Sequence, residues 1–373
     1  MVTSRRASLF AAAATILPAL TFAQPATQPV EPPPDRSREA PILSNIKQLT
    51  FGAQFERAGE AYFSPDGSKI IFQAVPDGQQ QYQMYIARLA RDGNRIDGAD
   101  MAVQISADVS RNTCGWFSPD GKTVLFASTA NKERPDEPTA GYQREGRNYR
   151  WAYPSGMELW VGPMPAVLDG PIDPKWFEKW PVRPLTDNDA YDAEGSFSPD
   201  GKHIIFTSNR SGDLELYAVK ADGTGLVQLT QTPGYDGGPF FSPDGRKVCY
   251  RSDRGGNDLL QVFVSDVVSD AAGNITGLAN EKQLTNDGNV NWGPFWHPSG
   301  EWIAWSTSAH GHHNYEVYIM RVDGSQRTRI TYSAGADVLP AFSPDGKHMI
   351  WSSKRTDDNT TQVFVADFAL PPG

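Results

Sequence analysis

The chain has 373 residues and a formal net charge of −10 at pH 7, from 34 Lys and Arg against 44 Asp and Glu. This acidic balance argues against a nucleic-acid partner and against an anionic membrane surface, because both attract positive charge. The 34 glycines, 29 prolines and 11% aromatic residues favour many short strands joined by tight turns over helices. Two cysteines, Cys114 and Cys249, are too few for a disulfide framework, so we expect two free thiols.

Residues 1–23 have the pattern of an export signal that is removed. Arg5 and Arg6 precede an apolar run over residues 9–20, and Thr21-Phe22-Ala23 has the small residues that a signal peptidase recognises. The run is shorter than the roughly 20 residues that span a bilayer, so we expect no transmembrane anchor. The arginine pair resembles a twin-arginine signal, and this route and the general secretory route both stay open. We therefore predict a periplasmic or secreted protein.

Residues 24–44 are predicted to form a proline-rich linker, followed by one folded domain over residues 45–373. The prolines of this segment include Pro25, Pro29, Pro32, Pro33 and Pro34. Such a composition stays extended and cannot bury a core.

A short motif recurs six times along the predicted domain. Its first copy is Tyr62-Phe63-Ser64-Pro65-Asp66-Gly67, and the others occupy residues 116–121, 196–201, 240–245, 295–300 and 341–346. A Leu-Thr-like pair precedes each copy. The hydroxyl residue of the pair lies 12 residues before the motif Ser, or its equivalent His297, in five copies and 14 in the first. Constant spacing of this kind indicates a repeat architecture.

Each repeat is predicted to fold as four antiparallel strands. Pro-Asp-Gly favours a tight turn, so a hairpin forms around it, and a third strand and the next Leu-Thr strand follow. Units of four strands repeated around an axis are the blades of a propeller. The sequence thus predicts an all-β fold, a six-bladed β-propeller. The last repeat lacks its outer strand, so we expect the N-terminal strand near Lys47 to Thr50 to close the last blade.

The Leu-Thr, Phe-Ser-Pro-Asp-Gly and Ser-x-Arg-x-Gly pattern resembles the repeats of the TolB propeller family over about residues 45–368. This resemblance implies a periplasmic protein of the cell envelope, related to the Tol and biopolymer-transport system. TolB also carries an α/β domain before its propeller. This chain has only the linker there, so contact with TolA through that domain is not expected. Similar repeats accompany many activities, so the resemblance indicates fold more strongly than function.

Two sets of repeat-equivalent polar residues are the candidate binding residues. Six positions before the motif Ser or its equivalent lie Asn112, Asp192, Asp236, Asn291 and Asp337, with Ala58 in the first repeat. In a propeller these residues would ring one channel mouth and suit a cation or a partner's N–H groups; alternatively, each caps its own loop. The second set is Arg210, Arg254 and Arg355. These would pair with a neighbouring blade's Asp or bind a ligand carboxylate.

The candidate metal site is the loop that holds His310, His312 and His313. Imidazoles this close can bind zinc, manganese or copper. Oligogalacturonate lyases, whose propeller repeats are similar, use histidines to hold manganese, which implies a metal-assisted hydrolase or lyase as the alternative function. No Gly-x-Ser-x-Gly elbow occurs, and no catalytic residue is predicted.

Two insertions interrupt the repeats, over residues 129–156 and 163–184. The first holds Arg144, Arg150 and Trp151 among other arginines and aromatics, and the second holds Trp176 and Trp180. Such residues form a partner surface or seal each loop onto its own blade. We therefore predict a scaffold that binds an envelope protein or peptide on the channel face. We expect this scaffold to need no cofactor. A divalent metal is expected only for the alternative function, the metal-assisted hydrolase or lyase.

Overall fold

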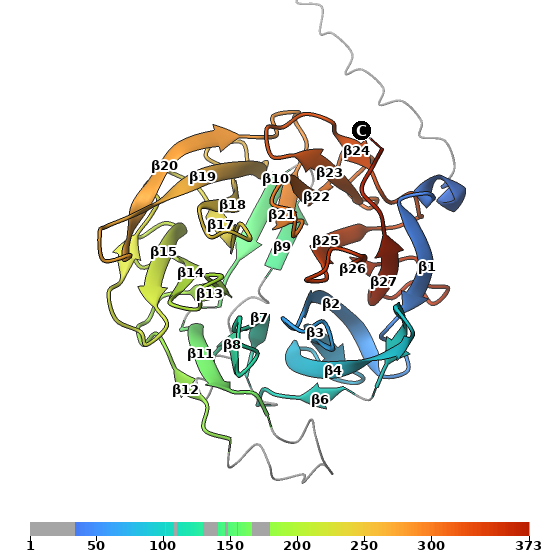
Figure 1. Ribbon diagram of the computed structural model, residues 1–373, viewed down its shortest axis with the longest axis horizontal. Coiled ribbons are helices and arrows are strands. Elements are labelled where there is room, and N and C mark those ends of the chain that lie inside the picture. The colour runs from blue at the N-terminus through green and yellow to red at the C-terminus, as the bar shows by residue number, and fades with distance from the viewer. Residues whose placement is uncertain are drawn as a thin grey trace, which may run out of the picture. The chain divides into compact units, whose positions relative to one another are not determined.

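Six antiparallel sheets stand around a common axis in the computed structural model (Figure 1). The model describes residues 34–100, 102–107, 110–129, 141–145, 148–154, 156–165 and 180–372. The sheets are the blades of the predicted all-β, six-bladed propeller, with four antiparallel strands per blade. Because the order of strands within each blade follows the repeat, the innermost strand always ends at a motif copy.

The strands of each blade run from the axis outwards. Blade 1 contains β2 (Phe55–Phe63), β3 (Lys69–Pro76), β4 (Gln83–Asp92) and β6 (Val103–Gln104), and β5 (Arg95–Ala99) pairs with the end of β4. Blade 2 contains β7 (Asn112–Phe117), β8 (Thr123–Ser128), β11 (Glu158–Pro163) and β12 (Arg183–Pro184). Blades 3 and 4 contain β13 (Asp192–Phe197), β14 (His203–Ser208), β15 (Glu215–Lys220) and β16 (Val227–Gln228), and then β17 (Asp236–Phe241), β18 (Lys247–Ser252), β19 (Gln261–Ser269) and β20 (Ile275–Gln283). Blades 5 and 6 contain β21 (Asn291–Trp296), β22 (Trp302–Thr307), β23 (Glu316–Arg321) and β24 (Thr328–Arg329), and then β25 (Asp337–Phe342), β26 (His348–Ser353), β27 (Gln362–Phe368) and β1 (Leu43–Gln48).

The N-terminal strand closes the ring, as predicted. β1 pairs antiparallel with β27, from Leu43 opposite Phe368 to Gln48 opposite Phe364, and the two strands lie side by side in Figure 1. The folded part begins before residue 45, where the sequence placed the start of the domain. The 3-10 helix η1 (Arg36–Glu39) precedes β1, and Glu39 and Ile42 are buried.

The Leu-Thr pair is explained by one hydrogen bond that recurs in every blade. The hydroxyl of its Ser or Thr accepts the backbone N–H of the second residue of the third strand, at 2.8–3.0 Å. The hydroxyls belong to Ser106, Thr186, Thr230, Thr285, Thr331 and, in the last blade, Thr50. Thr50 follows β1 and its hydroxyl bonds Val363 of β27, so this bond also helps to close the ring.

The motif turn has its own internal hydrogen bonds. In five copies the Ser hydroxyl donates to the Asp carboxylate two residues later at 2.6 Å, and in the fifth blade the His297 Nδ1 and Ser299 hydroxyl lie 2.9 Å apart. The final glycine has φ between 67° and 73° in all six copies. This left-handed conformation favours glycine, which accounts for the invariant last letter of the repeat.

The cores lie between neighbouring blades and consist of the apolar middle strands. Trp305, Trp351, Tyr250 and Phe206 are among the largest fully buried side chains. Both cysteines are free and buried. No helix in the described part of the chain is long and apolar enough to cross a membrane.

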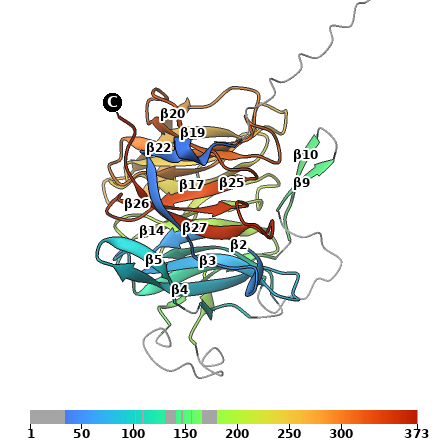
Figure 2. The same ribbon diagram turned by 90° about the vertical axis from the view of Figure 1, so that its right-hand side faces the viewer.

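The two insertions are only partly described. β9 (Gly141–Glu145) and β10 (Asn148–Ala152) pair with each other in a sheet of their own (Figure 2). The side chains of these strands and most of the remaining predicted partner surface lie outside the described residues. Trp180, at the end of the second insertion, donates from its indole nitrogen to the Pro163 carbonyl at 2.8 Å and stacks on Phe126. These contacts place Trp180 against blade 2.

Candidate functional site

The innermost strand of every blade carries a β-bulge at the same place. The pairing register with the second strand shifts two to five residues before the motif Ser or His297 in all six blades. The residue four positions before the motif Ser or His297 has a left-handed backbone in every blade, with φ between 48° and 59°. These six residues, here the bulge ring, are Glu60, Cys114, Glu194, Gly238, Gly293 and Leu339. Four of them have side chains, so each stores backbone strain of about 1–3 kcal/mol.

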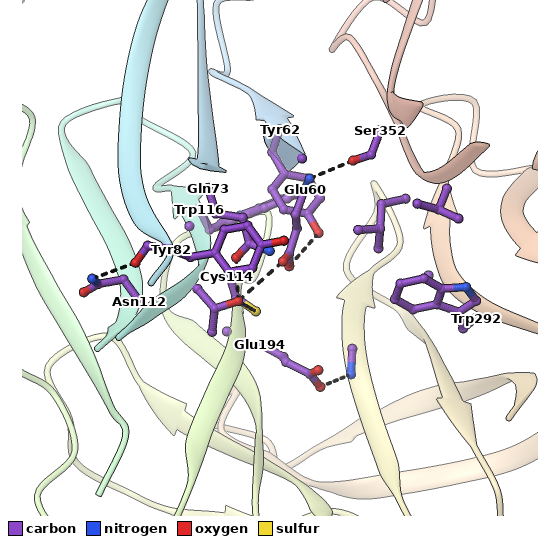
Figure 3. Close-up of a pocket in the computed structure, with 18 of the residues that line it drawn as sticks. Glu60, Tyr62, Gln73, Tyr82, Asn112, Cys114, Trp116, Glu194, Trp292 and Ser352 are labelled. Atoms are coloured by element: carbon purple, nitrogen blue, oxygen red, sulfur yellow. Dashed lines mark hydrogen bonds between the residues drawn. The ribbon is translucent and has the colours of Figure 1, made fainter. Parts of the chain in front are cut away.

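All six residues of the bulge ring line one central cavity of about 480 Å³. Figure 3 shows Glu60, Cys114 and Glu194 around this space, with Tyr62, Trp116 and Trp292 beside them. β-bulges often re-aim side chains next to functional sites. The ring therefore places acidic, thiol and apolar groups from different blades into one cavity.

Four aromatic rings close the cavity on the side of the motif turns. Tyr62, Trp116, Phe240 and Phe295 lie two positions after the bulge ring in four blades, and their ring centroids are 4.8–6.0 Å apart. Rings that touch one another across the axis leave no open channel at this level. We call them the aromatic floor. The cavity is therefore a cup that opens toward the ends at which the innermost strands begin, where Arg57, Tyr82 and Arg111 line it.

Glu194 is held by four donors. Its Oε1 accepts from Arg251 and from the Tyr235 hydroxyl, and its Oε2 accepts from the Gly238 N–H at 2.7 Å and the Thr207 hydroxyl at 2.8 Å. Arg251 reaches it from β18 because Gly238 has no side chain: a Cβ there would collide with the guanidinium. The carboxylate is thus neutralised and its hydrogen-bonding capacity is filled.

Glu60 occupies the equivalent position in blade 1 with much weaker partners. The hydroxyls of Tyr62 and Thr113 lie 3.4 and 3.5 Å from its carboxylate oxygens, and Thr113 also donates to Gln73 at 2.7 Å. Burial in the cup raises the pKa of Glu60 from its usual 4.5 to about 7, while the Cys114 thiol acts in the opposite direction. Glu60 is therefore the acid of the cup that changes charge near neutral pH.

The thiol of Cys114 and three tyrosines of the cup stay neutral. Burial, with the charges of Glu60 and Glu194, raises the pKa of the Cys114 thiol well above its usual range. Burial also raises the pKa values of Tyr62, Tyr191 and Tyr235. Because the thiolate is the nucleophilic form of cysteine, Cys114 is not activated for nucleophilic attack.

The predicted Asp and Asn residues lie at the starts of the innermost strands, and all five are buried. Four of them have a partner inside their own blade: Asp192 bonds Arg210, Asp236 bonds Arg254 at 3.1 Å, Asp337 bonds Arg355 at 3.0 Å and Asn291 bonds Trp305 at 2.9 Å. Asn112 of blade 2 instead donates to Gln83 of blade 1 at 2.9 Å. The arginines thus pair with the Asp of their own blade and not with a neighbour's. Of these eight residues, Asn112 lines the cup. A role of the set in ligand binding stays a prediction.

The three loop histidines do not converge. The His310 Nε2 lies 2.7 Å from the Tyr318 hydroxyl and its Nδ1 lies 3.2 Å from Arg329, while the rings of His312 and His313 lie against each other. Over the described ranges, no group of three or more His, Cys, Asp or Glu side chains is placed to hold a metal ion. The predicted metal site gains no support from this geometry and stays a prediction.

The sequence analysis missed the bulge ring. A simple signal was present, because the six residues stand four positions before the motif Ser or His297 and read Glu, Cys, Glu, Gly, Gly and Leu. Arg251 had no such signal. Its place in the cup depends on the space that Gly238 leaves in the neighbouring strand.

The comparisons with known proteins agree with this architecture. Residues 185–285 and 274–369 match the TolB beta propeller domain. The TolB homologues of Chlorobium luteolum and Chlorobium chlorochromatii are 35% and 34% identical over 169 and 161 residues, which are 45% and 43% of this chain. The matched part spans about a third of each relative, 34% and 33% of their lengths.

Solved structures show the same fold. A putative TolB from Agrobacterium tumefaciens has a TM-score of 0.53 and 18% identity, covering 84% of this chain and 91% of its own. An oligogalacturonate lyase in complex with manganese has a TM-score of 0.50 and 13% identity, covering 88% and 94%. Likeness at this level of identity concerns the arrangement of strands alone.

Proposed function

This chain is a TolB-like β-propeller, and we propose that it is a binding scaffold of the cell envelope whose ligand site is the central cup. The observation that carries the proposal is the cup itself: six left-handed bulge residues line it, four of them strained, and four aromatic rings close it at one end. Backbone strain at one equivalent position in four of the six blades persists when the surrounding fold enforces it, and such strain clusters at binding sites.

The chemistry of the cup supports binding rather than covalent catalysis. Cys114 is held as a thiol, and the oxygens of Glu194 are occupied by four donors. A rigid, pre-formed cavity binds with little ordering cost. A protein segment or peptide from an envelope partner, entering from the open end, is the occupant we propose, with export to the periplasm and a link to the Tol system.

A metal-assisted hydrolase or lyase was the alternative from the sequence. It was based on the loop that holds His310, His312 and His313. The likeness to a lyase structure concerns the fold, and fold alone does not carry function.

The test is capture of partners from an envelope extract by the purified protein. Val338 lines the cup, and Val338→Trp would place a much larger side chain in it. Val268→Trp adds the same bulk at an exposed position on β19 and is the matched control. We expect the wild type and the control to capture the same partner, and Val338→Trp to lose at least about tenfold of it, a difference of about 1.4 kcal/mol. Equal capture by all three proteins contradicts the proposal. Capture that requires the absence of a chelator favours the metal alternative.

A further inference from the structure

Glu60 and Glu194 occupy the same bulge position in two blades, yet only one of them is neutralised. Glu194 has Arg251 as a counter-ion and four donors in all. Glu60 has two hydroxyls at 3.4 and 3.5 Å and forms no ion pair with any residue that the structure describes. Among the residues that the structure describes, Glu60 is therefore a carboxylate of the cup without a directly paired counter-ion, and its remaining stabilisation comes from the Cys114 thiol and the more distant Arg251.

The surroundings of Glu60 are aromatic. Tyr62 and Trp116 of the aromatic floor lie in T-shaped contact at 4.8 Å, and Tyr82, Tyr191 and Trp292 also line the cup. The faces of aromatic rings carry negative charge and attract cations. A carboxylate among such faces forms an environment that a positively charged group satisfies.

We propose that the cup binds a primary ammonium group carried on an apolar or aromatic moiety, with Glu60 as its counter-ion and the aromatic floor beneath it. This inference rests on the proposed function, that the cup is a ligand site, and names the chemistry of the ligand. Such a group can belong to a lysine side chain, to a chain N-terminus or to a small amine, and the chemistry is the same in each case.

A neutral hydroxyl ligand fits less well. Hydroxyl donors could fill the hydrogen bonds that Glu60 lacks, but they would leave its charge uncompensated inside the cup, which is costly. An ammonium group supplies both the donors and the charge. The Glu194 and Arg251 pair is already balanced and needs neither.

The inference predicts the direction of the pH dependence. The titratable and charged groups that face Glu60 come from several elements and are Tyr62, Tyr82, Cys114, Tyr191, Glu194 and Arg251, with Arg57 and Arg111 at the open end of the cup. The tyrosines and the thiol stay neutral at neutral pH, and Glu194 and Arg251 offset each other. Because Glu60 has a pKa of about 7, it loses its charge as the pH falls from 8 to 6. Affinity for an ammonium group should therefore fall over that range.

Benzylamine and benzyl alcohol are the probes for the test, since they share a ring and differ in charge. Calorimetric titrations use the wild type, Glu60→Gln and Glu56→Gln, an exposed position on the same strand. We expect the wild type at pH 8 to bind benzylamine at least about tenfold more tightly than benzyl alcohol, a difference of about 1.4 kcal/mol. Glu60→Gln should lose this preference and Glu56→Gln should keep it. From pH 8 to pH 6, benzylamine binding should weaken about tenfold in the wild type.

Equal affinity of the wild type for the two probes, or an unchanged preference in Glu60→Gln, overturns the inference. If neither probe binds while capture stays sensitive to Val338→Trp, the ammonium site is wrong and the scaffold stands. If benzylamine binding depends on Glu60 but capture does not depend on the cup, the scaffold is wrong and the ammonium site stands. Thermal unfolding of each variant confirms that the propeller is intact.

Discussion

The guanidinium of Arg355 donates two hydrogen bonds to the carboxylate of Glu39, at 3.0 and 3.1 Å, although 316 residues separate them along the chain. Arg355 also bonds Asp337 at 3.0 Å, and all three side chains are buried. The bond thus ties the segment ahead of β1 to the last blade and supports the closure that β1 and β27 make through their backbones.

Replacing Glu39 with Gln should lower the free energy of unfolding by about 3 kcal/mol, because it removes one carboxylate from a buried ion pair. Urea unfolding at pH 7 measures the change. Asp35→Asn is the control, since Asp35 is exposed and Asn also caps a helix well. Equal stability of Glu39→Gln and the wild type would show that strand pairing alone closes the ring.

Asp192→Asn and Asp236→Asn test whether these residues stabilise their loops or bind a ligand. Each Asp is buried against an arginine of its own blade. If each Asp stabilises its own loop, each substitution should lower the free energy of unfolding by roughly 3 kcal/mol and leave the partner affinity of the folded protein unchanged. Weaker partner binding without loss of stability would instead support the predicted ring of acceptors at the channel mouth.

The repeat made most of the fold predictable, because its signals are local. Pro-Asp-Gly specifies a turn, and the hydroxyl of the Leu-Thr pair forms a hydrogen bond to the neighbouring strand. Because both signals recur in each repeat, the number of blades and the order of strands could be inferred. Glu39 could not be found in this way. It lies in a proline-rich segment, and its partner Arg355 is distant in the chain.

The cup was harder to predict than the blades for a geometric reason. Counting along a regular strand assumes that side chains alternate between its faces, and a bulge inserts one extra residue and changes that alternation. The residues predicted to ring the channel mouth, six positions before the motif Ser, lie on the correct strands, but that prediction missed Glu60 and Glu194. The contact of Arg251 with Glu194 also crosses from one blade to the next, which no single repeat encodes.

The two cysteines should differ in reactivity. Cys114 lines the cup, whereas Cys249 is fully buried between blades, and burial raises the pKa of both thiols. Iodoacetamide at pH 8 should modify Cys114 at least about tenfold more slowly than it does in the urea-unfolded chain, and Cys249 more slowly still. Mass spectrometry of timed samples measures both rates. Modification of Cys249 ahead of Cys114 would contradict the placement of Cys114 in an open cup.

Replacing Glu194 with Gln should destabilise the protein. Arg251 is buried and has Glu194 as its ion-pair partner, so the substitution leaves a buried cation with reduced compensation, at a cost of about 3 kcal/mol. Urea unfolding measures the loss, and Glu56→Gln, at an exposed position, is the control. A stable Glu194→Gln protein would mean that Tyr235 and water satisfy Arg251 without the carboxylate.

The same substitution at Glu60 should have the opposite effect. Burial raises the pKa of Glu60 from 4.5 to about 7, so folding favours its neutral form. The contribution of this neutral form to stability is present below about pH 4.5 and is lost as the pH rises through 7. The amide that replaces the carboxyl group in Glu60→Gln is neutral at every pH. It should therefore be more stable than the wild type at pH 8, by on the order of 2 kcal/mol, and the gain should shrink toward pH 5. Urea unfolding at both pH values measures this gain. Lower stability of Glu60→Gln at pH 8 would show that the carboxylate is held as firmly as that of Glu194, and would remove the reason to expect a ligand cation beside it.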